Sequence, residues 1–308
     1  MSSADNDAVR DADMAARLPS HPTTIVLVSL LSVYVAWGST YLAIRIALTA
    51  LPPFLLAGLR ALVAGALLLA WARWKGHGAV SRQALRNAAL VGVLLIGGGN
   101  GLVTYAEQWV SSSLAAAIAS SGSIWIVAIL AFLGERPTRL EQLGIAIGFT
   151  GVLLLNLDGE LRASPIGALA LLGATLSWAV GSVLTRRLVL PRGALMVAVE
   201  LLAGGAAMTV LGALLGERIV ISTLTHEAVL AWLYLIVAGS LVGFSAFTFL
   251  MRNVRPALAT SFVYVNPVVA LLLGVAIAGE HVTAVGYAGV AVSVLGLAVV
   301  TLASRVRG

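Results

Sequence analysis

Cysteine is absent from this sequence of 308 residues, and charged residues make up only 10% of it. The absence of cysteine excludes disulfides, thiol chemistry and thiolate metal sites. A soluble globular protein carries about 25% charged residues, so this chain has too few charges to cover a soluble body. Hydrophobic residues account for 60% of the chain, and the mean hydropathy is +1.01. Together these values indicate an integral membrane protein.

Histidine is also scarce, and its placement argues against catalysis. The four histidines, His21, His77, His226 and His281, lie in separate polar connections. An enzyme that acts on membrane lipids needs His, Asp, Glu or Ser side chains grouped at the membrane interface. No such group and no metal-ligand spacing occurs, so we expect no enzyme activity, no cofactor and no metal. A membrane-bound lipid-processing enzyme is kept only as an alternative.

What the sequence has in abundance is long apolar runs. Polar or Gly/Pro-containing breaks divide the chain into ten of them, each long enough to cross the hydrocarbon layer of about 30 Å as a helix. The expected limits are 24–48, 54–72, 88–106, 112–133, 140–157, 165–188, 194–215, 229–250, 257–278 and 284–304. We therefore predict an all-α protein with ten transmembrane helices.

The basic residues predict the orientation of these spans. Fifteen Lys and Arg residues lie in the two termini and in alternate connections, whereas the remaining connections hold only Arg162 and Arg218. Cytoplasmic loops carry an excess of Lys and Arg, so both termini are predicted to be cytoplasmic. Residues 1–23 lack the basic start and apolar core of a secretory signal and are expected to form a disordered tail. The net charge of +6 reflects topology and contact with anionic lipid, and no nucleic-acid partner is expected.

An internal repeat organises the spans. The phrase GERPT at residues 134–138 returns as GEHVT at 279–283, and at the same offset Gly144 and Gly151 fall on Gly289 and Gly296. Further upstream, Trp37 falls on Trp178. The pattern predicts two five-helix repeats, 24–157 and 165–304. Because each copy has an odd number of spans, the second must be inverted relative to the first, which is a common plan of secondary transporters.

These features resemble the drug/metabolite transporter superfamily, and within it the EamA family. The resemblance rests on AWGSTYLAIRIAL in the first span, LRALVAGALLLA in the second, the Gly-Glu endings of the fourth and ninth spans, and the duplication; it covers about residues 24 to 304. Within the family the chain looks most like the YddG-type exporters of aromatic amino acids and other metabolites. The resemblance implies efflux across the inner membrane.

The expected function is therefore that of a secondary transporter. We expect it to export small amphipathic metabolites, amino acids including aromatic ones among them, by alternating access of a site near mid-membrane. The alternative within the same fold is transport of drugs or of other metabolites such as nucleosides or sugars. The other expected partner is the lipid bilayer. A small-residue face at Gly144 and Gly148 is expected to pack internally, so the chain is a monomer or a weak homodimer.

Six helices are each expected to contribute one polar or amphipathic side chain at mid-membrane depth. They are Trp37, Asn100, Ser121, Trp178, Ser245 and Asn266, which form the repeat-related pairs Trp37/Trp178, Asn100/Ser245 and Ser121/Asn266. Polar groups at this depth face the bundle interior or a wet cavity, so we predict that these six bind substrate. Tyr41 and Tyr264 are second-rank candidates. The alternative is that Asn and Ser only join helices, at about 0.6 kcal/mol each, and that Trp anchors the interface.

Two charges lie inside the expected spans, Arg60 in the second and Glu200 in the seventh. The simplest expectation is structural pairing, with Glu107 neutralising Arg60 and with Arg186 or Arg187 neutralising Glu200. The alternative makes Glu200 a titratable coupling group and Arg60 an anchor for a substrate carboxylate. The run GGGNG at 97–101 lies within a span, so it indicates close helix packing or a flexible gating helix, and not a dinucleotide loop, which opens a helix after a strand.

Overall fold

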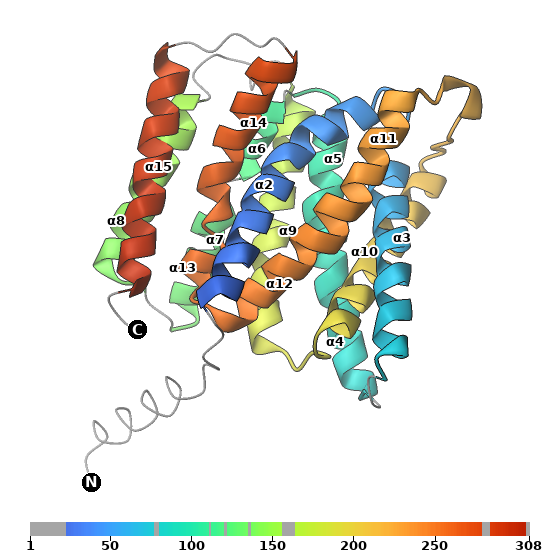
Figure 1. The fold of residues 1–308 in the computed structure, drawn as a ribbon, viewed down its shortest axis with the longest axis horizontal. Helices are drawn as coiled ribbons and strands as arrows, with labels where there is room; N and C mark the ends of the chain where they lie inside the picture. Colours follow the sequence, from blue (N-terminus) through green and yellow to red (C-terminus); the bar gives the residue numbers. More distant parts are fainter. Residues whose placement is uncertain are drawn as a thin grey trace.

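A computed structural model describes residues 23–76, 80–110, 112–119, 122–134, 137–155, 164–278 and 284–305, and no strand occurs in these ranges. The described elements are helices joined by short connections (Figure 1). In chain order they are α2 (Thr23–Ala47), α3 (Pro53–Trp74), α4 (Arg82–Gly92), η1 (Val93–Gly101), α5 (Leu102–Ala106), α6 (Ser112–Ala119), α7 (Gly122–Phe132), α8 (Arg139–Leu155), α9 (Pro165–Arg187), α10 (Ala194–Leu214), η3 (Ile221–Thr223), α11 (His226–Tyr234), η4 (Leu235–Gly243), α12 (Phe244–Asn253), α13 (Pro256–Ala259), α14 (Phe262–Ala278) and α15 (Ala284–Arg305).

Six stretches in the described ranges are long and apolar enough to cross a membrane. They are Thr23–Ala47, Pro53–Trp74, Arg82–Ala106, Pro165–Arg187, Ala194–Leu214 and His226–Asn253. The first three precede the middle of the chain and the last three follow it, so each half contributes three long helices. The chain is thus an all-helical membrane protein.

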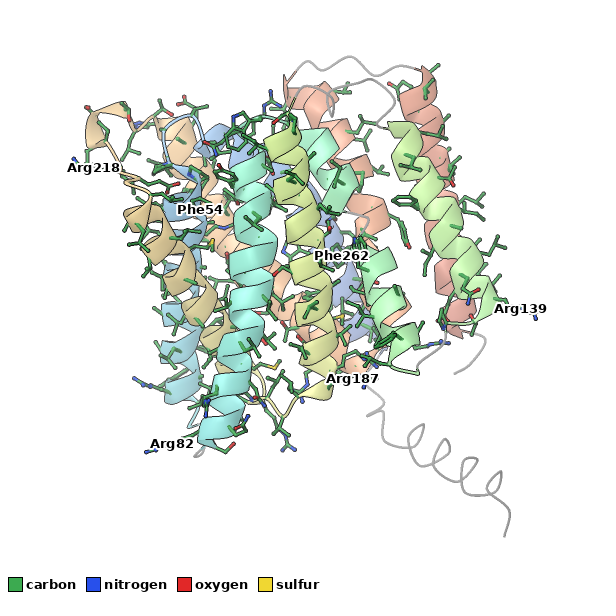
Figure 2. The ribbon with its side chains drawn as sticks, turned by 180° about the vertical axis from the view of Figure 1, so that it is seen from behind. Phe54, Arg82, Arg139, Arg187, Arg218 and Phe262 are labelled. Atoms are coloured by element: carbon green, nitrogen blue, oxygen red, sulfur yellow. The ribbon has the colours of Figure 1, made fainter. Side chains whose placement is uncertain are left out.

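The two ends of the bundle differ in charge. Arg82, Arg139 and Arg187 lie at one end, whereas Phe54 and Arg218 lie at the other (Figure 2). The first is called the basic end below. Helix α2 begins and α15 ends at the basic end (Figure 1).

Glycines bring helices of the two halves into close contact at both flanks of the bundle. Helix α3 packs against α10 on one flank, and α8 packs against α15 on the other (Figure 1). A Cβ added to Gly58 would lie only 2.7 Å from the backbone nitrogen of Thr209, and one added to Gly296 would lie 2.8 Å from the carbonyl oxygen of Gly144. Small residues allow this close approach of backbones in membranes. The expected internal packing of the Gly144–Gly148 face is confirmed.

Polar side chains at the helix starts explain where some helices begin. Ser81 Oγ accepts a hydrogen bond from the backbone N–H of Ala84, and this N-cap starts α4 at Arg82 instead of at the expected residue 88. At the opposite end, both carboxylate oxygens of Glu217 accept hydrogen bonds from the first turn of α3. A carboxylate at a helix N-terminus is stabilising because it meets unpaired N–H groups and the positive end of the helix dipole.

Two central helices contain nine-residue π-helical stretches, η1 between α4 and α5 and η4 between α11 and α12. In a π-helix each N–H bonds to the carbonyl five residues back, which widens the turn, and such stretches occur frequently at functional sites. The expectation of close packing at GGGNG is met, since a Cβ on Gly99 would lie 2.7 Å from Trp178 Cε3. The π-helical form itself was not expected from the sequence.

The close packing of α4 against α10 predicts the effect of a matched pair of substitutions. A Cβ at Gly92 would lie 2.5 Å from Glu200 Cα, whereas a Cβ at Gly97 would find Met208 Cε at an ordinary 3.5 Å. Overpacking of this kind costs about 2 kcal/mol. Gly92→Ala should therefore lower the thermal unfolding midpoint of the detergent-purified protein, followed by tryptophan fluorescence, and Gly97→Ala should leave it nearly unchanged. Equal midpoints for the two variants would contradict this packing.

Candidate functional site

A cavity lies inside the bundle between α2, α9, η1, η4 and α14. Its empty volume is about 910 Å³, counting the space at its mouth. Residues from both halves of the chain line it. The lining reaches Ile44 of α2 and Val103 of α5, which lie within one turn of the ends of those helices opposite the basic end.

Five aromatic side chains close the cavity on the side of the basic end, and are called the aromatic floor: Trp37, Trp178, Phe244, Phe247 and Phe262. The rings of Trp37 and Trp178 meet edge to face with centroids 5.3 Å apart, and Phe247 lies 5.1 Å from each of them. Trp37 Nε1 donates a hydrogen bond of 3.0 Å to the carbonyl oxygen of Gly239. Because this bond satisfies the indole nitrogen, the floor presents an apolar surface.

One wall of the cavity carries a buried positive charge. Arg60 of α3 lines the cavity with only 4% of its surface exposed, and its Nη2 donates to Asn100 Oδ1 of η1. Glu107, which is 5% exposed, interacts electrostatically with Arg60 and also with Arg45. Glu107 therefore acts on Arg60 at a distance, since neither carboxylate oxygen of Glu107 has a hydrogen-bond partner among the described residues, and the expected neutralisation of Arg60 stays a prediction.

The opposite wall is formed by α14 and α2. Asn266 lines the cavity, is 2% exposed, and interacts with the side chain of Tyr41, which also lines the cavity. Asn266 Oδ1 has no hydrogen-bond partner in the described part of the chain. The cavity thus has an aromatic floor between two polar walls, a form suited to a small molecule with one apolar and one polar side.

Between the aromatic floor and the basic end, side-chain contacts join the ends of several helices. Arg186 Nη1 donates to the carbonyl oxygens of Met251 at 2.8 Å and Val254 at 3.0 Å. Arg255 forms a salt bridge of 2.6 Å with Glu141. Each contact joins segments far apart in the sequence and so holds helix ends together at the basic end.

Comparison with known proteins identifies the family. The EamA-like transporter family matches residues 24–157 and again residues 165–302. The chain belongs to the EamA-like transporter family. The chain is 41% identical over 275 residues to the uncharacterized inner membrane transporter YedA of Escherichia coli K12, covering 89% of this chain and 90% of the relative.

Two further comparisons place this EamA-like protein among distant relatives. It is 26% identical over 295 residues to a probable amino-acid metabolite efflux pump of Salmonella typhimurium LT2, covering 90% of this chain and 95% of that one. A solved crystal structure superposes with a TM-score of 0.73 at 23% identity, covering 92% of this chain and 99% of that chain. The fold is therefore one already seen by crystallography, and the protein is a membrane transporter and not an enzyme.

The cavity of this EamA-like transporter brings together five of the eight substrate-binding candidates chosen from the sequence. Trp37, Tyr41, Asn100, Trp178 and Asn266 all line it. That these side chains bind substrate is a proposal taken up below.

The other three candidates have different positions. Ser245 is half-buried in α12 and is not among the lining residues. Tyr264 is 2% exposed and faces α8, because a Cβ on Gly148 would lie 2.6 Å from Tyr264 Cε1. Ser121 lies outside the described residues.

Sequence reasoning missed several lining residues. Ser240 takes the place in η4 that was expected for Ser245, and Thr40 and Thr175 also line the cavity. Depth within a span was estimated on regular α-helical geometry, and the π-helical stretch changes which side chains face inward. The glycines at 239 and 243 were the available signal, because Gly243 permits the close approach of Trp37 to η4 and Gly239 permits that of Thr40.

Glu200 lies away from the cavity, on the α10 face that packs against α4 and η1. It is completely buried, and neither carboxylate oxygen has a hydrogen-bond partner among the described residues. The charge of Arg252 acts on Glu200, and the expected pairing with Arg186 or Arg187 stays a prediction. Arg252 Nη1 itself donates to the carbonyl oxygen of Pro191, so Glu200 belongs to the packing near the basic end.

Proposed function

We propose that this EamA-like transporter exports small amphipathic metabolites, including aromatic and other amino acids, across the inner membrane. The observation that carries the proposal is the cavity with an aromatic floor and two polar walls. The Salmonella relative is described as a probable amino-acid metabolite efflux pump and the E. coli relative as an uncharacterized inner membrane transporter, which supports the same substrate class and location.

The proposed architecture is a pair of inverted five-helix repeats, 24–157 and 165–304, with ten spans in all. Three observations support it. The family matches the chain twice, the π-helical stretches η1 and η4 occupy corresponding places in the two halves, and each flanking helix pair takes one helix from each half. Two oppositely oriented copies around one cavity give inward-open and outward-open states of similar energy, as alternating access requires.

The proposed transport cycle assigns the present conformation to one of these states. By the excess of Lys and Arg, the basic end is the cytoplasmic one. The aromatic floor and the Arg186 and Arg255 contacts close that end, while the cavity lining reaches the other end. This conformation therefore faces outward. The inward-facing state requires those contacts to break and the two tryptophans of the floor to separate.

The proposed binding roles follow from the chemistry of the lining. Trp37 and Trp178 stack on the apolar part of the substrate. Asn100, Asn266 and Tyr41 hydrogen-bond its polar part. Ser121 is proposed as a further polar contact, since its neighbours Ala119 and Gly122 line the cavity.

Shortening a side chain of the aromatic floor or of the polar wall to alanine should reduce transport without unfolding the protein. In proteoliposomes that exchange labelled for unlabelled amino acids, Trp178→Ala and Asn266→Ala should each lower the initial rate by about ten-fold, as expected for loss of a central binding contact. Trp71→Ala is the matched control, because Trp71 is exposed near the basic end of α3, close to Lys75. Wild-type rates in both cavity variants would contradict the assignment. Exchange of cationic drugs with no exchange of amino acids would favour the multidrug alternative.

The proposed orientation can be tested by labelling, because the chain has no native cysteine. Gln83→Cys lies beside Arg82 at the basic end, and Thr223→Cys lies in η3 at the opposite end. A membrane-impermeant maleimide added to intact spheroplasts should label Thr223→Cys and leave Gln83→Cys unlabelled, and everted vesicles should reverse the result. The opposite pattern would place the basic end outside.

A further inference from the structure

The guanidinium of Arg60 is buried, but the described residues do not accept hydrogen bonds from all of its nitrogen atoms. Its Nη2 donates to Asn100 Oδ1, but its Nη1 has no hydrogen-bond partner among the described residues. The side chain is 4% exposed and lines the cavity. A charged group removed from water is costly unless its hydrogen-bonding atoms are satisfied, so an unpaired Nη1 marks a position for an acceptor that the chain does not provide.

The surrounding charges leave this cation incompletely neutralised. Glu107 acts on both Arg60 and Arg45, so one carboxylate is shared between two guanidinium groups. Glu107 does not hydrogen-bond to Arg60, because both of its carboxylate oxygens lack partners in the described part of the chain. Glu217 accepts hydrogen bonds at the N-terminus of α3, away from the guanidinium in the middle of that helix. Arg60 therefore has no hydrogen-bonded acidic partner among the described residues.

Nη1 of Arg60 lies beside Gly239, in the π-helical stretch η4. A Cβ on Gly239 would lie 3.8 Å from Nη1 and 3.0 Å from Thr40 Cγ2, so the absence of a side chain at Gly239 lets the backbone of η4 pack close to Thr40 and to the guanidinium. Gly239 and Thr40 both line the cavity. Guanidinium groups recognise carboxylates by a planar pair of N–H donors, and Nη1 is the donor of Arg60 that no described residue accepts from.

A second unpaired atom lies on the opposite wall and has the complementary chemistry. Asn266 Oδ1 is an acceptor without a partner among the described residues, on a side chain that is 2% exposed. An acceptor there suits an ammonium or hydroxyl donor, while the aromatic floor suits an apolar group. One cavity thus offers a cation, an acceptor and an aromatic surface.

We propose that Arg60 is the carboxylate-binding residue of the cavity, and that the substrates are amphipathic carboxylates whose donor group faces Asn266 and whose apolar part lies on the aromatic floor. This inference rests on the proposed transport function and narrows it. Cationic amphiphiles without a carboxylate are excluded, since they would meet the positive charge of Arg60.

The test compares four compounds that share a phenyl ring: phenylalanine, phenylalanine methyl ester, 3-phenylpropionate and 2-phenylethylamine. Binding to the purified protein in lipid nanodiscs is followed by tryptophan fluorescence at neutral pH, because Trp37 and Trp178 line the cavity. Phenylalanine and 3-phenylpropionate should bind about 10- to 100-fold more tightly than the ester and the amine, as expected for a charge-assisted hydrogen bond. Equal or tighter binding of the ester or the amine would overturn the proposal, as would failure of all four to bind.

Substitutions of Arg60 test whether this residue causes the preference for carboxylates. Arg60→Gln should abolish the preference for carboxylates, and Arg60→Lys should restore part of it, since it retains the charge without the planar fork. Arg73→Gln is the matched control, because Arg73 is exposed at the basic end of the same helix. A normally folded Arg60→Gln protein that keeps the full preference would overturn the proposal, and if this variant does not fold the wild-type compound series decides alone.

Transport of the same four compounds separates this proposal from the broader function. If the carboxylates bind selectively but proteoliposomes exchange none of them, the carboxylate site stands and the transport proposal fails. If the amine or the ester is exchanged as fast as phenylalanine, transport stands and the role of Arg60 fails.

Discussion

An apolar helix bundle in a membrane leaves its polar side chains few places, and this constraint determines where the cavity lies. Water is absent from the hydrocarbon layer, so a polar group at that depth must face the protein interior or a wet space. Arg60, Asn100 and Asn266 all meet the requirement in the same way, by turning into one cavity between the two halves. The aromatic floor then separates that polar space from the basic end, where Arg186 and Arg255 make their own contacts. The cost of placing polar groups in the hydrocarbon layer therefore explains both where the cavity lies and why polar contacts gather at the basic end.

Glycine gives the helices the freedom to meet this constraint. At the flanks, Gly58 and Gly296 let helices of opposite halves approach until their backbones touch. In the centre, Gly99 and Gly243 lie against Trp178 and Trp37, so the π-helical stretches hold the two tryptophans of the floor in place. A carrier must exchange two packings of nearly equal energy, and interfaces of small residues with few interlocking side chains suit such a rearrangement.

Much of the fold could be predicted from the sequence, because span length, charge asymmetry and the repeated glycines are properties of the chain itself. Helix limits such as Pro165–Arg187 and Ala194–Leu214 lie close to those expected. The site was less predictable: Trp37, Trp178 and Asn100, which were chosen by depth and repeat pairing, line the cavity, whereas Ser245 and Tyr264 do not. Depth along a span says nothing about which way a side chain faces, and the π-helical form of η4 could not be read from its composition. The electrostatic partner of Glu200 likewise depends on how α12 packs, which no local pattern records.

The central claim is that two oppositely oriented halves open one cavity to each side of the membrane in turn. Pulsed electron–electron distance measurements test it directly, with spin labels at Thr49 and Ile166 near the outer mouth and at Leu140 and Val189 at the basic end, all exposed positions. In lipid nanodiscs, addition of a transported amino acid should shift the two distance distributions in opposite directions, one pair closing as the other opens. Distances that stay fixed, or that lengthen together, would contradict alternating access.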